Sequence, residues 1–290
     1  MSTAAAGHRL NLSAAAASIA VAVCLVTLKL WALTTTGALS IGASLADSVI
    51  DLAIALANLA ALRYAVLPPD EAHRFGHTAI EDIAALAQSV LVIGSGLLIL
   101  WGVGLRLANP RPLTDEGVGL AVMLVASALT TALVLWQRRV ARRTGSRIVA
   151  ADSMHYVADL LPNLAAIVAL AASAAFGVSG LDSLLAALAA LWLMRSGVRL
   201  GRASVDALMD REAPEETVAR IRAAVGGVPG LRGTHDLKTR MSGTKLFVQF
   251  HAEVEGATPL ADAHEVGEEA RRRILAACPG AEVIIHKDPV

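Results

Sequence analysis

Apolar side chains run almost unbroken from Leu12 to about Leu200, and charged residues there are concentrated in short connecting stretches. A helix that crosses the apolar core of a membrane needs roughly 20 apolar residues. Stretches of this length predict six transmembrane helices, over residues 11–33, 40–65, 82–105, 116–137, 149–175 and 181–202. The connections between them are short and contain turn-forming residues, as in Asn109–Pro112.

The pattern changes beyond Asp210, where polar and apolar residues mix. Helical periodicity is found over residues 212–225 and 260–277, and strand-like runs over 234–238, 245–253 and 281–286. Ser242-Gly243 between the first two runs indicates a β-hairpin. The order αββαβ predicts a small two-layer α+β domain. We therefore expect a six-helix transmembrane domain over residues 1–209 and a cytoplasmic α+β domain over 210–290.

The composition agrees with a membrane protein that carries a soluble tail. Hydrophobic residues make up 55% of the chain and charged residues 17%, whereas about a quarter is charged in a soluble domain. The formal net charge is zero, so nothing suggests a nucleic-acid partner. Cys24 and Cys278 are isolated, which indicates packing residues rather than a disulfide framework or a thiolate metal site.

Arginine residues mark one side of the predicted bundle. The connection between the fourth and fifth helices holds a cluster of them: Arg138, Arg139, Arg142, Arg143 and Arg147. Arg63 and Arg74 lie on the same side. The opposite side has Arg106 and Arg111, and the Lys29 ammonium can extend toward it. Because short cytoplasmic loops carry the excess of Lys and Arg, both termini are predicted to be cytoplasmic.

Four ionisable residues fall inside two of the predicted membrane helices. Asp47 and Asp51 lie four residues apart, as do His155 and Asp159, so each pair projects from one helical face. Counting about 1.5 Å per residue from opposite membrane edges places both pairs near the midplane. Ionisable groups are costly in a membrane and indicate a functional site. Three carboxylates and one imidazole supply the four ligands of a tetrahedral zinc site.

The donor set also bears on which ion is bound. Oxygen and nitrogen donors without thiolate argue against copper(I) and leave zinc, cadmium, iron(II), cobalt and manganese open. Metal ions and protons compete for the same lone pairs, and imidazole is the usual proton carrier near neutral pH. This competition is sufficient in principle to exchange metal for protons.

Two further groups of potential ligands lie outside the predicted helices. Asp70, His73 and His77 follow the second helix at spacings that place them on one side of a helical turn. The tail holds a larger group: His235, His251, His264, His286 and Asp288. In it, His251 and His286 fall at predicted strand ends and His264 on the helix between them. These groups and the membrane quartet account for seven of the eight histidines.

The residues of these groups resemble the cation diffusion facilitator family, and within it the bacterial zinc/proton antiporters of the ferrous-iron-efflux type. The resemblance covers essentially the whole chain. Its most specific stretches are Ser44–Asp51, Pro69–His77, His155–Asp159, Thr234–Arg240 and Val283–Asp288.

The resemblance implies a homodimer in a bacterial inner membrane that works by alternating access driven by the proton gradient. Asp47, Asp51, His155 and Asp159 would form the transport site, and the loop group a second metal site. The tail resembles the family's metallochaperone-like domain, in which a binuclear site is regulatory or structural. One departure concerns a lysine that pairs with an aspartate after the sixth helix, because Ala79 stands at the lysine position while Asp210 is present.

We therefore expect proton-coupled export of divalent metal, with zinc preferred. The alternative substrates are iron(II), cadmium and cobalt, exported through the same ligands. A metal sensor, in which the tail signals and the helices only anchor it in the membrane, is the alternative outside transport. The charged residues inside the helices argue against it, because a passive anchor needs no buried charge. An intramembrane metalloenzyme is disfavoured because the HExxH signature is absent and four ligands leave no open position.

Overall fold

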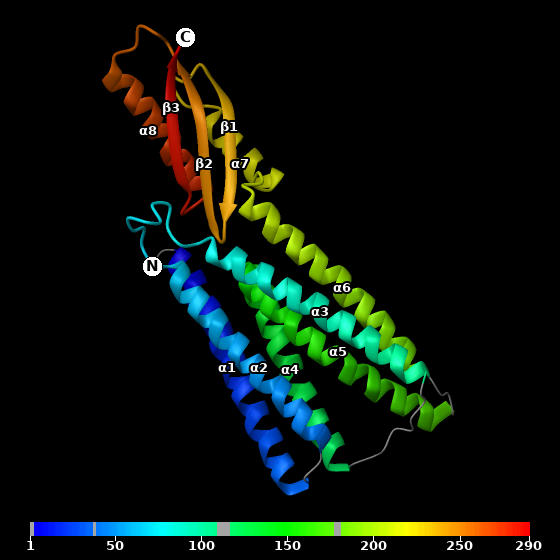
Figure 1. Ribbon diagram of the computed structural model, residues 1–290. Coiled ribbons are helices and arrows are strands. Elements are labelled where there is room, and N and C mark those ends of the chain that lie inside the picture. Colours follow the sequence, from blue (N-terminus) through cyan, green and yellow to red (C-terminus); the bar gives the residue numbers. More distant parts are fainter. Residues whose placement is uncertain (1–2, 37–38, 109–116, 177–180) are drawn as a thin grey trace. The chain divides into compact units, whose positions relative to one another are not determined.

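A computed structural model describes residues 3–36, 39–108, 117–176 and 181–290 of this chain. The chain divides into two compact units, one formed by residues 7–204 and the other by residues 205–290 together with 1–6. The first contains the long apolar helices and the second the small sheet (Figure 1). Each unit has its own core.

All six predicted apolar stretches are helical in the part of the chain that the structure describes. The helices are α1 (Thr3–Thr36), α2 (Leu39–Ala65), α3 (Ile80–Ala108), α4 (Gly117–Thr144), α5 (Arg147–Phe176) and α6 (Leu181–Leu208). Four of them contain segments long and apolar enough to cross a membrane: Ala6–Thr35, Ser44–Ala65, Ile80–Leu105 and Ser183–Leu208. Crossing by α4 and α5 stays a prediction.

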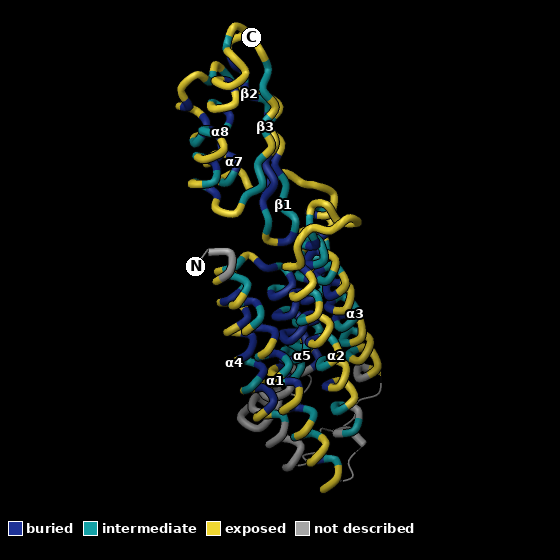
Figure 2. Tube along the Cα trace, turned by 90° about the vertical axis from the view of Figure 1, so that its left-hand side faces the viewer, coloured by how far each residue is buried: buried dark blue, intermediate teal, exposed yellow. Residues whose placement is uncertain are grey.

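Helix α5 is the centre of the bundle, since it packs against α2, α3 and α4. Tyr156 and Val157 of α5 are buried with Val92 of α3 and Leu133 of α4. A second cluster joins Ile148 of α5 to residues of α1, α2 and α4. Buried residues accordingly lie on the sides of the helices that face one another (Figure 2). This packing fixes the α5 side chains relative to those of α2.

Helices α3 and α6 approach closely because α6 carries glycine at the contact. A Cβ atom added to Gly197 would lie 2.8 Å from Ile93 Cγ1 and 3.2 Å from the Ser89 carbonyl oxygen. A Cβ atom on Gly201 would lie 2.7 Å from Ser89 Oγ. Small residues four apart are a common means of bringing membrane helices together.

The C-terminal unit has the predicted order αββαβ. Its elements are α7 (Glu215–Val225), β1 (Gly233–Ser242), β2 (Lys245–Val254), α8 (Leu260–Ala277) and β3 (Glu282–Pro289). The sheet order is β1-β2-β3, with β1 antiparallel and β3 parallel to β2. Strand β1 extends four residues beyond its predicted end, and the turn lies at Gly243 and Thr244 rather than Ser242-Gly243.

The reason for the longer strand lies in cross-strand contacts. Arg240 pairs with Phe247, and its guanidinium carbon lies 4.5 Å from the centre of the Phe247 ring. The hairpin therefore stabilises a polar stretch that carries no strand pattern of its own. Gly243 has a φ of +54°, which a glycine adopts without strain.

Alternation along β2 separates the two faces of the sheet. Leu246, Val248 and Phe250 are buried in one core with Ile221 of α7 and Ile274 of α8. Side chains at alternate positions point to the other face. His251 therefore lies on the face away from the two helices, within β2 rather than at its end.

Candidate metal sites

The structure brings three of the four predicted membrane ligands together. His155 Nε2 lies 3.0 Å from Asp51 Oδ1 and 3.9 Å from Asp159 Oδ2. One ligand atom from each of these residues lies within 4.8 Å of the other two. Asp51 comes from α2, and His155 and Asp159 come from one face of α5. We call these three residues the membrane triad.

Asp47 does not belong to this close group. It lies one helical turn before Asp51 on α2 and is exposed. It is nevertheless close enough to interact electrostatically with Asp159 and with Lys29. The quartet is thus a triad with a fourth carboxylate on the neighbouring turn.

The donor atoms of the membrane triad suit a cation. His155 Nδ1 and Asp159 Oδ2 are buried and have no hydrogen-bond partner among the described residues. Buried polar atoms are normally hydrogen-bonded, so such atoms call for an explanation. The His155 side chain is 8% exposed and that of Asp159 is 40% exposed. The triad therefore combines enclosed donors with access from the Asp159 side.

Lys29 of α1 lies beside the same stretch of α2. Its ammonium group donates hydrogen bonds to the Ser44 carbonyl oxygen at 2.9 Å and to Ser48 Oγ at 2.7 Å. These two acceptors hold the ammonium against the first half of α2, and its extension toward the membrane surface stays a prediction.

Asp152 is a buried carboxylate that the sequence analysis missed. It accepts hydrogen bonds from Ser18 at 2.7 Å, Asn58 at 2.9 Å and Gln137 at 2.5 Å. The available signal was an acidic residue inside a predicted membrane helix, three positions before His155.

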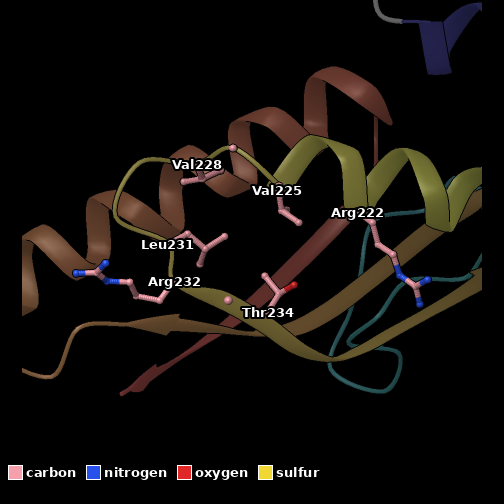
Figure 3. Close-up of a pocket in the computed structure, with 9 residues that line it drawn as sticks. Arg222, Val225, Val228, Leu231, Arg232 and Thr234 are labelled. Atoms are coloured by element: carbon pink, nitrogen blue, oxygen red, sulfur yellow. The ribbon is translucent and has the colours of Figure 1, made fainter.

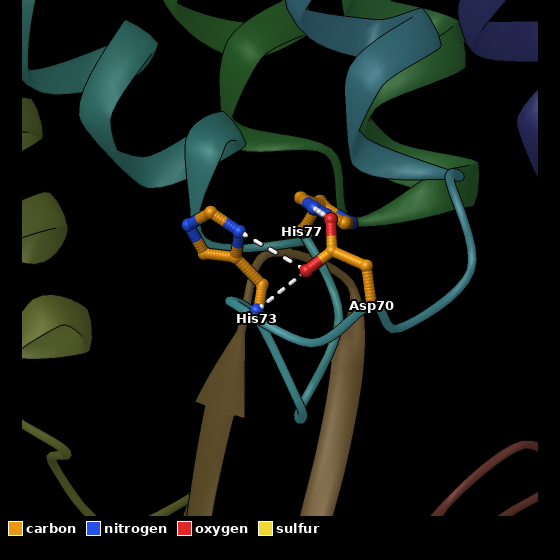
Figure 4. A group of neighbouring side chains, drawn as sticks. All are labelled: Asp70, His73 and His77. Atoms are coloured by element: carbon orange, nitrogen blue, oxygen red, sulfur yellow. Dashed lines mark hydrogen bonds and ion pairs between the residues drawn. The ribbon is translucent and has the colours of Figure 1, made fainter.

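The loop group assembles, but not on a helix. Residues 66–79 form turns, in which Asp70 Oδ1 accepts the backbone N–H groups of Ala72 and His73 at 2.9 and 2.6 Å. An aspartate that binds its own following N–H groups favours a turn over a helix. His77 Nε2 lies 3.2 Å from Asp70 Oδ2, and His73 Nδ1 lies 3.5 Å from Asp70 Oδ1 (Figure 4).

The turn also favours the ionised form of the Asp70 carboxylate. The backbone hydrogen bond from His73 lowers the pKa of Asp70, and the bond from Ala72 adds to the effect. Asp70 and His73 are exposed, whereas His77 is buried against the Tyr64 ring, with ring centres 4.6 Å apart. One ligand is thus fixed by packing and two are accessible to an ion.

In the tail, three histidines occupy one row across the sheet. His235 of β1 pairs with His251 of β2, which pairs with His286 of β3. Neighbouring ring centres are 5.0 and 4.9 Å apart. Asp288 contacts all three: its carboxylate lies 2.8 Å from His251 Nδ1, 3.3 Å from His235 Nε2 and 3.1 Å from His286 Nε2. We call this arrangement the histidine row.

His264 is outside the close group formed by His235, His251 and Asp288. It is exposed on α8. The sequence prediction placed it in the tail site from its residue type, its position on the helix between the strands and the family resemblance, and this assignment stays a prediction. The hydrogen bond from His251 lowers the pKa of Asp288, so this carboxylate stays ionised further into acid than a free aspartate.

The cavities of the C-terminal unit do not coincide with the histidine row as a whole. One of about 270 Å³ lies between the end of α7 and the start of β1. Val225, Val228 and Leu231 point into it, while the charged ends of Arg222 and Arg232 extend away from it (Figure 3). A second, of about 440 Å³, includes His235 and Asp236 in its lining. Neither offers a set of metal ligands.

Asp210 has a partner within its own chain. Its Oδ1 accepts a hydrogen bond from Arg240 Nη1 at 2.8 Å. The residue has a φ of +58°, in the left-handed region. The aspartate that the resemblance pairs with a lysine therefore pairs here with an arginine of β1, consistent with Ala79 at the lysine position.

Comparison with known proteins agrees with these features. Residues 15–209 match the cation efflux transmembrane domain, and residues 213–290 match the cytoplasmic domain of cation efflux proteins. The cation-efflux pump FieF of Klebsiella pneumoniae is 43% identical over 282 residues, which are 97% of this chain and 93% of that protein. FieF of Shewanella oneidensis is 43% identical over 277 residues, 96% and 93% of the two chains.

Solved structures resemble the C-terminal unit. The zinc form of the putative zinc transporter CzrB is 39% identical and covers 27% of this chain and 90% of that chain, with a TM-score of 0.25. The metal-bound C-terminal domain of the CzcD transporter from Thermotoga maritima is 29% identical and covers 26% and 87%, with the same TM-score.

Apolar helices that enclose carboxylates and an imidazole indicate an intramembrane functional site, and the match to the cation efflux domains makes the protein a multi-pass membrane transporter rather than an enzyme. The family models cover nearly the whole chain, and the relatives are similar over nearly their whole length. The chain belongs to the cation efflux family, also called the cation diffusion facilitators.

Proposed function

We propose that this protein exports divalent metal ions, zinc foremost, from the cytoplasm in exchange for protons. The observation that carries the proposal is the membrane triad, whose ligand atoms lie within 4.8 Å of one another inside a bundle of apolar helices. Asp47 serves as the fourth ligand from the next turn of α2. Cation efflux is also what the FieF relatives are named for.

The choice of zinc follows from the donor atoms. One imidazole nitrogen with carboxylate oxygens suits zinc and cadmium, and iron(II) and cobalt remain alternative cargo. Four protein ligands can complete a tetrahedral shell. Because each ligand must be deprotonated to bind, metal entry displaces protons and proton entry displaces metal.

The surrounding assignments belong to the same proposal. Positive charge near α4 and α5 supports cytoplasmic termini in a bacterial inner membrane, with a transmembrane domain over 1–209 and a cytoplasmic domain over 210–290. Two chains form a homodimer, in line with the match to the dimerising cytoplasmic domain. The Asp70–His73–His77 loop and the histidine row, together with His264, bind metal in a regulatory or structural role.

Zinc flux into proteoliposomes under an imposed pH gradient tests the function. The parent protein is compared with Asp51→Ala and with Ser153→Ala, a buried α5 residue whose hydroxyl has no partner among the described residues. We expect proton-driven zinc accumulation in the parent and in Ser153→Ala, and none in Asp51→Ala.

The other outcomes separate the parts of the proposal. Movement of another divalent ion instead of zinc would keep the mechanism and change the cargo. Normal transport by Asp51→Ala, or no transport of any ion by the parent, would defeat the proposal and favour a membrane-anchored metal sensor.

A further inference from the structure

Asp152 connects α5 to three other helices. Its residue is 4% exposed, and its carboxylate accepts one hydrogen bond from each of α1, α2 and α4. The α2 donor, Asn58, in turn accepts a hydrogen bond from Gln88 of α3 at 2.6 Å. Five helices are therefore tied to one buried carboxylate. We call the five residues the Asp152 network: Ser18, Asn58, Gln88, Gln137 and Asp152.

The network lies on one side of the membrane triad. On α5 it is three residues before His155, toward the helix start at Arg147. On α2 it is seven residues after Asp51, toward the helix end at Ala65. Both of these helix ends face the cytoplasm in the proposed orientation. The Asn58–Asp152 hydrogen bond thus crosses the route between the cytoplasm and the triad.

The stretch on the network side of the triad is closely packed. Ala55 of α2 is 0% exposed there, and Ile148 of α5 is 1% exposed. Within the triad, the Asp159 side chain is 40% exposed, whereas those of Asp51 and His155 are 13% and 8% exposed. The stretch that holds the Asp152 network is therefore closed by buried side chains, and the most exposed member of the triad is the one that lies furthest from the network on α5.

The closing groups are polar, and their bonding is incomplete. The side-chain carbonyl oxygens of Gln88 and Gln137 are buried without a hydrogen-bond partner among the described residues. A buried acceptor without a hydrogen-bond partner costs free energy. Water that enters on opening would donate the missing hydrogen bond and remove that cost. Polar groups can also bind water in an open state, which the side chains of an apolar seal cannot do. Such a closure can break and re-form without a large net cost.

We propose that the Asp152 network is a latch: its hydrogen bonds close the cytoplasmic route to the membrane triad, and they separate when that route opens. The proposal rests on the proposed function for its orientation and cargo. Asp152 is a positioning residue in this scheme and not a metal ligand. It lies between the cytoplasm and the triad, where separation of α2 from α5 must break its bond to Asn58.

Accessibility of position 55 tests the latch directly. Ala55 lies between Asp51 and Asn58 on α2, so Ala55→Cys reports the closed stretch. The background carries Cys24→Ser and Cys278→Ala in the full-length chain. A membrane-impermeant thiol reagent is applied from the cytoplasmic side of vesicles with known protein orientation, and the labelling rate is measured.

Asn58→Ala removes the bond between α2 and Asp152, and loss of one net hydrogen bond shifts a two-state equilibrium about fivefold. We expect a labelling rate about fivefold above that of the parent. Gln88→Ala, which removes the donor to Asn58, is the second variant and is expected to act in the same direction. Ser153→Ala is the matched control, because it changes a buried α5 residue outside the network, and it should label like the parent.

A swapped pair provides the rescue. In the double variant Asn58→Asp with Asp152→Asn, the amide donates from α5 and the carboxylate accepts from α2. Ser18 and Gln137 can still donate to the remaining oxygen of residue 152. We expect this double variant to label as slowly as the parent. Rescue would show that the labelling rate depends on the hydrogen bond between the two residues and not on either side chain alone.

Three results would overturn the latch: unchanged labelling in folded Asn58→Ala and Gln88→Ala, an equal rise in Ser153→Ala, or a swapped pair that labels as fast as Asn58→Ala. Thermal unfolding of each variant establishes which ones are folded. Zinc flux, measured on the same proteins, tests the transport function separately. A parent that moves no metal defeats the proposed function, while the labelling still shows whether the network closes this side.

Discussion

His155 Nε2 lies 3.0 Å from Asp51 Oδ1, although the two residues are 104 positions apart in the chain. The contact joins the first third of α5 to the middle of α2. Neither helix alone holds the membrane triad, so any movement of α5 against α2 changes the distance between ligands. An ion held by all three residues would therefore fix the position of α5 relative to α2.

His155→Asp should change which ion is preferred. The substitution converts the mixed donor set into an all-carboxylate set, which suits manganese better than zinc. We expect zinc transport to fall and manganese competition against zinc to rise, as measured by competition flux in proteoliposomes. His155→Gln, which keeps a neutral side chain of similar length, is the control and should lose zinc transport without gaining manganese. An unchanged zinc preference in His155→Asp would remove His155 from the transport site.

The loop group should bind a metal ion of its own. Asp70 contacts both loop histidines, so Asp70→Asn should weaken zinc binding there by about tenfold to a hundredfold. Bound zinc per chain, measured by elemental analysis at a free zinc concentration between the dissociation constants of the parent and variant loops, should then fall by nearly one. Glu71→Gln alters the adjacent exposed carboxylate and should leave the count unchanged. Equal zinc content in Asp70→Asn and the parent would contradict the loop site.

The histidine row should lose metal when its shared carboxylate is removed. Asp288→Asn takes a charge from the residue that contacts all three histidines. We expect zinc to raise the unfolding temperature of the parent and to raise that of Asp288→Asn less, because ligand binding stabilises the folded state. Glu265→Gln on α8 changes an exposed carboxylate elsewhere and should respond like the parent. A zinc response of equal size in Asp288→Asn would exclude this residue as a ligand.

The close approach of α3 and α6 should be sensitive to a single methyl group. Gly197→Ala places a Cβ atom 2.8 Å from Ile93 and should destabilise the protein by about 1–3 kcal/mol. Gly94→Ala on α3 meets nothing within 4 Å and should be neutral or stabilising by about 0.5–1 kcal/mol. Thermal unfolding in detergent measures both. Equal unfolding temperatures for the two variants would show that the helices separate freely at this contact.

Much of this architecture could be predicted from the sequence, because its signals are local. Apolar runs gave the six helices, and the spacing of His155 and Asp159 by four residues placed them on one face. The role of Asp152 could not be predicted, because its hydrogen-bond partners come from other helices and a single acidic residue forms no spacing pattern. The full length of β1 was missed for a similar reason, since Arg240 is stabilised by Phe247 across the hairpin.

Other features depend on distances that no spacing rule contains. His264 has the residue type of a ligand, but helix α8 does not place it in the close group on the sheet. Asp210 matches the position that the resemblance pairs with a lysine, yet Arg240 is its partner here. Residue type at a matching position therefore does not predict which side chains lie beside it.

The histidine row has a consequence for how the tail tolerates insertions and deletions. His235 and His251 are aligned through a two-residue turn and through a β-bulge between His235 and Lys238, so loss of one residue from the bulge would shift their pairing and rotate the histidine of one strand to the opposite face. His251 and His286 are joined through α8, and the connections at the two ends of that helix can absorb a change in length. The row therefore tolerates a change in chain length between Val254 and Glu282, and it depends on the bulge between the first two histidines.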